Sequence, residues 1–428
     1  MKLFNKSQEM LARAEKVIPL GAQTFSKSRT QYPYGVSPYF ISHGKGSRIW
    51  DVDGNEYTDY INALASVTLG YCDPDVTAAV EVQLRKGTIF TLSTEIEIEV
   101  AERIVHMVPC AEKVRFGKNG SDATAGAVRV ARAFTGREHI AVCGYHGWQD
   151  WYIGSTTRNL GVPQAVRGLT HSWTYNDASS LEAVFMAHPG AIAAVVMEPM
   201  NISEPKFGFL EEVQALCRKH GALLVFDETI TGFRYAPGGA QEMLGITPDL
   251  ACFGKGLANG YPLAAVAGRA DVMKLMEEVF FSFTFGGETL SLAASGATLD
   301  KVASQDVTGH LAKLGTELMI GVQGLIDKHG MQELMTSTGH PSWSFLVLKD
   351  VPGCSSFHSK TLFMQEMFQR GILAYGTHNL TFAHTREDIA RLLVVYDEVF
   401  PIMRAGALEG RMAGLLRCNP LEPLFKIR

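Results

Sequence analysis

The chain has 428 residues, more than one compact core usually holds, so we expect two unequal domains or one large domain with an appendage. Hydrophobic residues make up 46% of the chain and charged residues 19%, a balance that excludes intrinsic disorder and fits a soluble protein with a large core. The formal net charge of -5 gives no electrostatic reason to expect a nucleic acid or an anionic membrane as partner, and no apolar run is long enough to cross a bilayer.

The N-terminal part of the chain predicts a helix followed by a β-hairpin. Residues 1–21 predict an amphipathic helix that is capped near Ser7 and ends at Pro19. They hold no apolar signal core and no small-residue cleavage site, so we expect a cytoplasmic protein. Residues 47–57 predict a hairpin, because Asp53-Gly54-Asn55 supplies turn chemistry between two alternating strands.

The middle of the chain alternates short apolar runs with helical patterns. Strands are predicted at 114–116, 139–143, 191–197, 222–226, 249–253 and 264–267, with helices at 121–135, 178–188 and 210–220. Apolar runs without polar alternation, separated by helices, indicate an α/β domain whose mostly parallel sheet is covered on both faces. Such sheets bind their ligands beyond the carboxyl ends of the strands.

The C-terminal part has a different pattern. It predicts helices at 290–305, 308–329 and 386–404 and a short β region at 342–348. We therefore assign 61–290 to a large domain, and 1–60 together with 291–428 to a smaller α+β domain. The seven cysteines are scattered without a CxxC pair, which favours reduced, mostly buried thiols over disulfides, and we expect no metal site.

Two strand ends deliver the residues that bear chemistry. The strand at 222–226 is followed by Asp227, and the strand at 249–253 is followed by Gly254-Lys255-Gly256. An aspartate at a strand end is usually a helix cap or a metal ligand, and a lysine in a loop is usually solvated. A lysine between two glycines directly after a buried strand is unusual, because loops seldom need a bare backbone on both sides of a long cation.

Three further segments lie near the predicted strand ends. The turn and helix start at Gly120-Ser121 offer unpaired amides and hydroxyls to a phosphate, although an ordinary helix cap by Asn119 or Ser121 explains the pattern equally well. Tyr145, in Tyr-His-Gly, can lie flat on a heteroaromatic ring or simply fill the core. The turn at 281–287 offers the hydroxyl of Thr284.

These parts match the needs of pyridoxal 5′-phosphate (PLP), which requires a lysine, an acid beside its ring nitrogen, a phosphate cradle and a flat side chain. The chain resembles the class III (omega) aminotransferases of PLP fold type I, and among them glutamate-1-semialdehyde 2,1-aminomutase. The likeness covers nearly the full length. It depends on these segments: 44–46, 50–54, 70–71, 119–124, 145–147, 198–199, 227–234, 254–256, Thr284 and 383–385.

The resemblance implies a large domain with a mostly parallel, seven-stranded sheet, a smaller α+β domain built from both chain ends, and a homodimer with shared active sites. Catalytic roles are implied for Lys255, which carries the cofactor, for Asp227 beside the ring nitrogen, and for Tyr145, which stacks on the ring. Thr284 would reach the phosphate of the neighbouring subunit. The implied cofactor-binding positions are Asn119, Gly120, Ser121, Tyr145, His146, Glu198, Asp227, Thr229, Lys255 and Thr284.

Several positions depart from the family pattern. Glycine and serine are exchanged at Gly120-Ser121, and Thr229 stands where valine is common. Ile230 is apolar as in the aminomutases, yet the aminomutase glutamate before Ala383-His-Thr385 has no counterpart. We therefore expect an aminotransferase acting between an amino donor and a ketone or aldehyde in a specialised biosynthetic pathway. A 2,1-aminomutase, a PLP racemase or decarboxylase, and a catalytically silent PLP-fold binding protein are the alternatives. Residues 154–168 form either an active-site lid or a surface loop.

Overall fold

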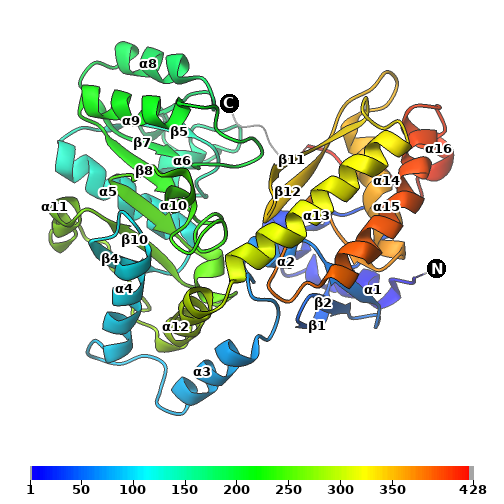
Figure 1. Cartoon of the computed structure of the whole chain (residues 1–428), viewed down its shortest axis with the longest axis horizontal. Helices are drawn as coiled ribbons and strands as arrows, with labels where there is room; N and C mark the ends of the chain where they lie inside the picture. The colour runs from blue at the N-terminus through cyan, green and yellow to red at the C-terminus, as the bar shows by residue number, and fades with distance from the viewer. Residues whose placement is uncertain (1, 424–428) are drawn as a thin grey trace. The chain divides into compact units, whose positions relative to one another are not determined.

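The computed structural model describes residues 2–423, which divide into two compact units (Figure 1). We call residues 65–68 and 74–309 the central unit, and residues 2–64, 69–73 and 310–423 the terminal unit. Within the described residues, no helix is long and apolar enough to cross a membrane. All seven cysteines are free, and five of them are buried. The domain boundaries expected from the sequence stay a prediction.

The central unit is built on a seven-stranded sheet with the strand order β4-β10-β9-β8-β7-β5-β6. Strand β10 runs antiparallel to both of its neighbours, and the remaining pairs are parallel, so the predicted mostly parallel sheet is confirmed. The strands are β4 (Lys113–Gly117), β5 (His139–Cys143), β6 (Thr170–Ser172), β7 (Ile192–Met197), β8 (Leu223–Asp227), β9 (Leu250–Phe253) and β10 (Ala264–Gly268). Edge strand β6 was not predicted, because three residues are too few to show a period.

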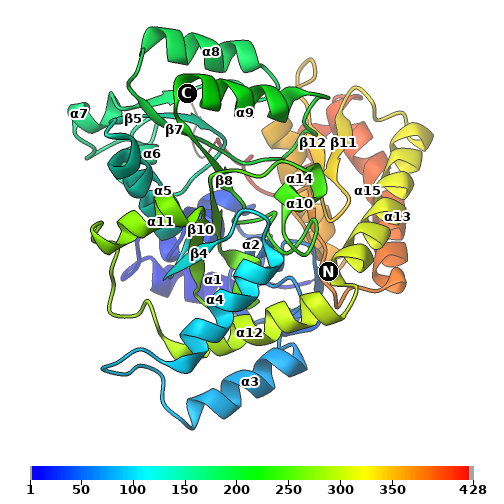
Figure 2. The same ribbon diagram turned by 60° about the vertical axis from the view of Figure 1, so that its left-hand side comes forward.

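Helices cover both faces of this sheet because successive strand residues point to opposite sides. In β8, Leu223 and Val225 belong to the apolar cluster that includes α5 (Gly120–Thr135). Leu224 and Phe226 belong to the cluster on the other face, which includes α8 (Ala178–Ala187) and α9 (Phe209–His220). Figure 2 shows α8 and α9 side by side over the strands β5 and β7. This fully apolar strand is therefore buried on both faces, as its sequence indicated.

Further helices complete the central unit. They are α3 (Pro74–Leu84), α4 (Glu95–Met107), α6 (Asp150–Ile153), α7 (Gln164–Arg167), α10 (Ala240–Leu244), α11 (Ala270–Met273) and α12 (Thr289–Ser304). Helix α12 packs against both α3 and α4.

The terminal unit contains two small sheets. One has the order β1-β2-β3-β13 and includes the predicted hairpin, formed by β2 (Arg48–Asp51) and β3 (Glu56–Asp59). The other has the order β11-β12-β14. The remaining elements are α1 (Asn5–Ala14), β1 (Ile41–Lys45), α2 (Asn62–Ala65), α13 (Val307–Lys328), β11 (Met335–His340), β12 (Trp343–Leu348), α14 (Ser356–Gln369), β13 (Ile372–Leu373), β14 (Thr377–Asn379), α15 (Arg386–Ala407) and α16 (Met412–Leu415).

The predicted start and end of the N-terminal helix were wrong. Helix α1 begins at Asn5, before the expected cap, and ends at Ala14, before Pro19. Ser7 does not cap the helix but lies buried inside it. The cap comes from the hairpin turn instead, where the Asp53 carboxylate accepts hydrogen bonds from the backbone N–H of Lys6 (2.7 Å) and of Ser7 (2.9 Å). A distant carboxylate at a helix N-terminus leaves no local sequence signal.

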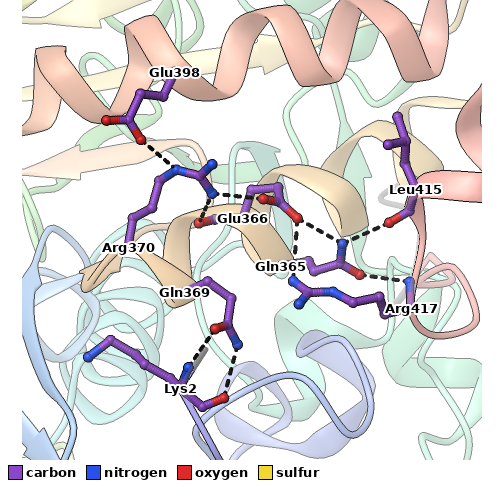
Figure 3. Close-up of polar contacts among 8 residues, drawn as sticks. All are labelled: Lys2, Gln365, Glu366, Gln369, Arg370, Glu398, Leu415 and Arg417. Atoms are coloured by element: carbon purple, nitrogen blue, oxygen red, sulfur yellow. Dashed lines mark hydrogen bonds and ion pairs between the residues drawn. The ribbon is translucent and has the colours of Figure 1, made fainter.

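Two glutamines of α14 hold segments from both ends of the chain (Figure 3). Gln369 accepts from the backbone N–H of Lys2 (2.7 Å) and donates to its carbonyl oxygen (3.2 Å). Gln365 donates to the carbonyl oxygen of Leu415 (3.0 Å) and accepts from the N–H of Arg417 (2.8 Å). An amide side chain can pair with a backbone segment as another strand would, so α14 fastens both segments to the terminal unit.

Candidate active site

Lys255 lies where β9 ends and a short 3-10 helix begins. Its side chain is half-buried, and its backbone has φ 45°, in the left-handed region that non-glycine residues seldom adopt. Both flanking glycines are closely packed, Gly256 more tightly than Gly254. A Cβ on Gly254 would lie 3.3 Å from Cγ2 of Thr229, and a Cβ on Gly256 would lie 2.4 Å from Oγ1 of Thr68. Gly254 thus lets the backbone bearing the lysine approach Thr229, just after β8, and Gly256 lets it approach Thr68.

Asp227 is the last residue of β8, is buried, and is held by a histidine. Its Oδ2 lies 2.9 Å from Nδ1 of His146, whose Nε2 lies 3.1 Å from the carbonyl oxygen of Cys143. A carbonyl oxygen can only accept, so Nε2 donates to it. With Oδ2 of Asp227 at Nδ1, both ring nitrogens of His146 have a partner, and the carboxylate is held in place.

The other carboxylate oxygen of Asp227 is satisfied by Thr229. Oδ1 accepts from the backbone N–H of Thr229 (3.1 Å) and from its hydroxyl (2.5 Å). The threonine methyl group packs under the helix start, since a Cβ on Gly120 would lie 2.9 Å from it. The threonine that departs from the family pattern therefore adds a hydrogen bond to the acid and keeps an apolar contact.

The N-terminus of α5 faces the same region. The Asn119 side chain accepts from the N–H of Asp122 (3.3 Å), and the Asp122 carboxylate accepts from the N–H of Asn119 (2.9 Å). This capping box does not use the backbone N–H groups of Gly120 and Ser121, which also have no acceptor within the helix. Asn119 thus acts as an ordinary cap, and the same helix start still offers two N–H groups to an anion.

Ser121 is buried and positioned by the turn after β5. Its Oγ accepts from the backbone N–H of Trp148 (3.1 Å), which leaves the hydroxyl hydrogen free to be donated. The turn comes close because Gly147 has φ 103°, and a Cβ there would lie 2.0 Å from the Ser121 Oγ. No other residue type could be placed at Gly147 without moving Ser121.

The same turn presents Tyr145 and contacts Glu198. The Tyr145 side chain is 50% exposed, and its ring meets Tyr152 edge-on at 5.6 Å. A Glu198 oxygen accepts from the N–H of Tyr145 (3.2 Å) and from the Asn201 side chain (2.7 Å). The outer face of the Tyr145 ring is therefore open to a planar ligand, while Glu198 fixes the backbone behind it.

Burial shifts the pKa values of the lysine and of one acid. It lowers the pKa of Lys255, and the Glu198 and Asp227 carboxylates oppose this effect without overcoming it. Burial raises the pKa of Glu198, which the nearby His146 partly offsets. A lowered pKa increases the neutral fraction of the amine at a given pH, and the neutral amine is the form that can act as a nucleophile or a base. Together with the amides of α5, Asp227 and the open tyrosine ring, this amine fits the functional groups of PLP.

Comparisons with known proteins agree with this geometry. The model of the aminotransferase class-III family matches residues 31–340. A 3-aminobutyryl-CoA aminotransferase of Cloacimonas acidaminovorans (strain Evry) is 32% identical over 395 residues, which cover 90% of this chain and 94% of that protein. A glutamate-1-semialdehyde 2,1-aminomutase of Sorangium cellulosum (strain So ce56) is 36% identical over 426 residues, covering 92% and 95%. The chain belongs to the class-III aminotransferases.

Solved structures show the same family and fold. The PLP internal aldimine form of the Sphingopyxis sp. MTA144 FumI protein superposes with a TM-score of 0.88 at 31% identity, covering 97% of this chain and 99% of that one. A β-phenylalanine aminotransferase of Variovorax paradoxus has a TM-score of 0.82 at 28% identity, covering 97% and 96%. Class-III aminotransferases are PLP-dependent enzymes, so the predicted fold type, enzyme class and cofactor are confirmed.

Sequence reasoning left three residues of this aminotransferase without a role. Glu228, next to Asp227, is buried and accepts hydrogen bonds from the N–H groups of Ala240 (2.5 Å) and Gln241 (3.1 Å), so it caps α10. Arg234 is fully buried and donates to Thr68 (3.2 Å). Asn201 holds Glu198. The roles of Glu228 and Arg234 depend on partners 12 and 166 residues away, whereas Asn201 is three residues from Glu198 but belongs to no pattern that predicts the contact.

Two expected features remain predictions. Thr284 is exposed in its turn, and its role toward a neighbouring subunit is untested. In the segment 154–168, Arg167 donates to the carbonyl oxygens of Val162 (2.8 Å) and Asn159 (2.8 Å). This arginine therefore braces its own segment, whether that segment acts as a lid or as a surface loop.

Proposed function

We propose that this class-III aminotransferase moves an amino group between an amino donor and a ketone or aldehyde acceptor in a specialised biosynthetic pathway. The observation that carries the proposal is the pairing of Lys255, whose amine is half-buried and has a lowered pKa, with Asp227, which is buried and held by His146. A nucleophilic amine and an anchored acid, both at carboxyl ends of sheet strands, are what amino transfer on PLP requires.

Each residue has a separate task in this proposal. PLP, when bound, supplies a ring that draws electrons from the substrate carbon bearing the nitrogen. Lys255 would hold the cofactor, and its freed amine would carry the proton from that substrate carbon to the C4′ carbon of the cofactor. Asp227 holds the proton on the ring nitrogen, while the amides of Gly120 and Ser121 and the Ser121 hydroxyl bind the phosphate. Tyr145 packs against the ring and orients it.

The substrate class is proposed from two observations. No acidic residue lies between Tyr375 and Ala383, where the aminomutase pattern has its glutamate. Similar proteins are named a 3-aminobutyryl-CoA aminotransferase and a β-phenylalanine aminotransferase, so related chains act on amines that are not on the α-carbon of an acid. We infer an acceptor carbonyl other than glutamate 1-semialdehyde. The shared-site homodimer and the cytoplasmic location belong to the same proposal.

A 2,1-aminomutase is the second candidate function. Relatives named glutamate-1-semialdehyde 2,1-aminomutase are 33–36% identical to the chain, and Ile230 is apolar as in that branch. An aminomutase needs no separate acceptor, because the amino group returns to the same molecule.

The two functions are separated by the need for an acceptor. PLP-loaded protein is mixed with single amino compounds, one of them glutamate 1-semialdehyde, without a separate carbonyl acceptor, and the cofactor absorbance and the product are followed. An aminotransferase stops after one product per active site and resumes only when an acceptor is added. Many turnovers of glutamate 1-semialdehyde without an acceptor would instead establish the aminomutase.

A further inference from the structure

Three histidines from separate elements meet at the edge of the central sheet. His139 begins β5, His171 lies in the middle of β6, and His188 directly follows α8. One ring nitrogen from each lies within 4.8 Å of the other two. Nδ1 of His139 is 2.8 Å from Nε2 of His171, and the ring centroids of His171 and His188 are 3.8 Å apart. We call these residues the histidine cluster.

The backbone positions the cluster before any ligand binds. His171 pairs with Ala141 across β5 and β6, and His139 lies two residues before Ala141, so both imidazoles are on the same face of the sheet. The loop after α8 is fastened to the start of β5, since Ala191 accepts from the N–H of His139 (3.1 Å) and donates to the carbonyl oxygen of His188 (3.1 Å). The three side chains therefore converge from fixed points.

Two histidines of the cluster, His139 and His171, have lowered pKa values, which favours their neutral form. Burial, helped by the two neighbouring histidines, lowers the pKa of His171 to about 4, and burial also lowers the pKa of His139. The other charges acting on His139 are Glu138 and Arg132, which oppose each other. Neutral imidazoles each expose one nitrogen lone pair, and a lone pair is what a transition-metal ion needs.

An ion can reach the cluster from solvent. All three histidines are half-buried rather than sealed. His171 and His188 line a hollow of about 720 Å³ together with Ser155, Gln164 and Arg167. The hollow has room for water, which can fill a coordination position that the protein leaves open.

We propose that the histidine cluster binds one divalent transition-metal ion of the zinc, cobalt, nickel or copper class, with water as a further ligand. Nitrogens bound to one tetrahedral ion at about 2.0–2.1 Å are roughly 3.3 Å apart. The 2.8 Å contact between His139 and His171 must therefore open by about 0.5 Å, and the donating ring must move its proton to its other nitrogen.

The bound ion would fasten the short edge strand β6 to β5 and to the end of α8. It shares no residue with the Lys255 site, so its expected effect is on stability rather than on amino transfer. This site differs from the expectation of no metal site, because no local pattern predicts it. The two strand histidines are 32 residues apart and match no metal-binding spacing.

Zinc binding tests the proposal directly. Tag-free PLP-loaded protein is treated with EDTA, dialysed against zinc chloride, and analysed for zinc content and melting temperature. The variants are His171→Gln and His188→Gln, and the latter lies outside the sheet and so protects the test against misfolding. The control is His220→Gln, because His220 is also half-buried and stacks on a ring of α8 (Phe185, 4.4 Å) but is outside the cluster.

We expect one zinc ion per chain, with a raised melting temperature, in the native and His220→Gln proteins. Both cluster variants should bind zinc more than about tenfold more weakly, since loss of even an outer-shell partner weakens metal binding by about 10- to 100-fold. The proposal would be overturned if the native protein failed to retain zinc. It would also be overturned if His171→Gln and His188→Gln retained as much zinc as the native protein.

Discussion

Asp227 and His146 form a buried pair, with Oδ2 of the aspartate 2.9 Å from Nδ1 of the histidine. The carbonyl oxygen of Cys143 accepts from the other ring nitrogen of His146, so the histidine is fixed on both sides (3.1 Å). The pair orients the carboxylate that we place beside the ring nitrogen of PLP. His146 is therefore a positioning residue for the proposed catalytic acid.

We predict that His146→Gln folds and binds PLP but reacts more slowly with amines. A hydrogen bond to a charged group contributes about 1.5–3 kcal/mol, so the half-reaction rate should fall by roughly 10- to 150-fold. The matched control is Thr229→Val, which removes the hydroxyl that donates to the other carboxylate oxygen but keeps the N–H donor at 3.1 Å. Equal losses in both variants would show that His146 has no special part in holding Asp227.

Replacing the acid itself should have the larger effect. Asp227→Asn keeps the shape of the side chain but cannot hold a proton on the ring nitrogen, an interaction that matters most in the transition state. We expect a loss of about 3–5 kcal/mol, or roughly 100- to 5,000-fold in rate, measured in single-turnover reactions. A near-normal rate would mean that another acid does this work.

Gly147, in the turn after β5, offers a steric test of the phosphate site. Gly147→Ala should weaken PLP binding, because its Cβ would lie 2.0 Å from the Ser121 Oγ. Gly190→Ala is the control, since Gly190 also has a positive φ (69°) but its Cβ would meet nothing within 4 Å. Both variants bear the backbone strain of alanine at positive φ, about 1–2 kcal/mol. Only Gly147→Ala should also raise the dissociation constant for PLP, measured by titration of the apoprotein.

The lowered pKa of Lys255 predicts a pH dependence of stability in the apoprotein. The amine has its ordinary pKa of 10.5 when the chain is unfolded and a lower pKa when the chain is folded. Between these two pKa values the unfolded chain binds more protons, so the free energy of unfolding rises with pH and levels off above 10.5. Lys255→Met should lack this rise. Denaturant titrations of both proteins across this range measure it, and parallel curves would refute the assignment.

Subunit mixing tests the role proposed for Thr284. Thr284→Ala should weaken PLP retention by about 1–2 kcal/mol, the scale of one hydrogen bond to a charged group. Consider a mixed dimer of one Lys255→Ala chain and one Thr284→Ala chain. If each active site takes residues from both chains, one site has both substitutions and the other has neither, so activity returns in part. If Thr284 serves its own chain, every site keeps one defect and mixing restores nothing.

The central sheet and its helices were predictable because their patterns are local. Apolar runs such as the one ending at Asp227 define strands without reference to the rest of the chain, and their helices follow from spacing. The roles proposed for Lys255 and Asp227 depend on the family resemblance as well, since a strand end alone does not distinguish a catalytic acid from a cap.

What could not be predicted depends on contacts between distant segments. The cap of α1 comes from Asp53, the partner of Asp227 comes from the turn after β5, and the histidine cluster joins three elements. The hydroxyl bond from Thr229 to Asp227 is local, at a separation of two residues. The family resemblance does not predict it, because the valine that is common at this position has no hydroxyl to donate.

The most direct test of the central claim is to locate the cofactor on the chain. Purified protein loaded with PLP is reduced with borohydride, digested with trypsin and mapped by mass spectrometry. We predict that the pyridoxyl group is found on Lys255 and that Lys255→Ala yields no labelled peptide. A label on another lysine, such as Lys118 beside the start of α5, or no label on the native protein, would contradict the account.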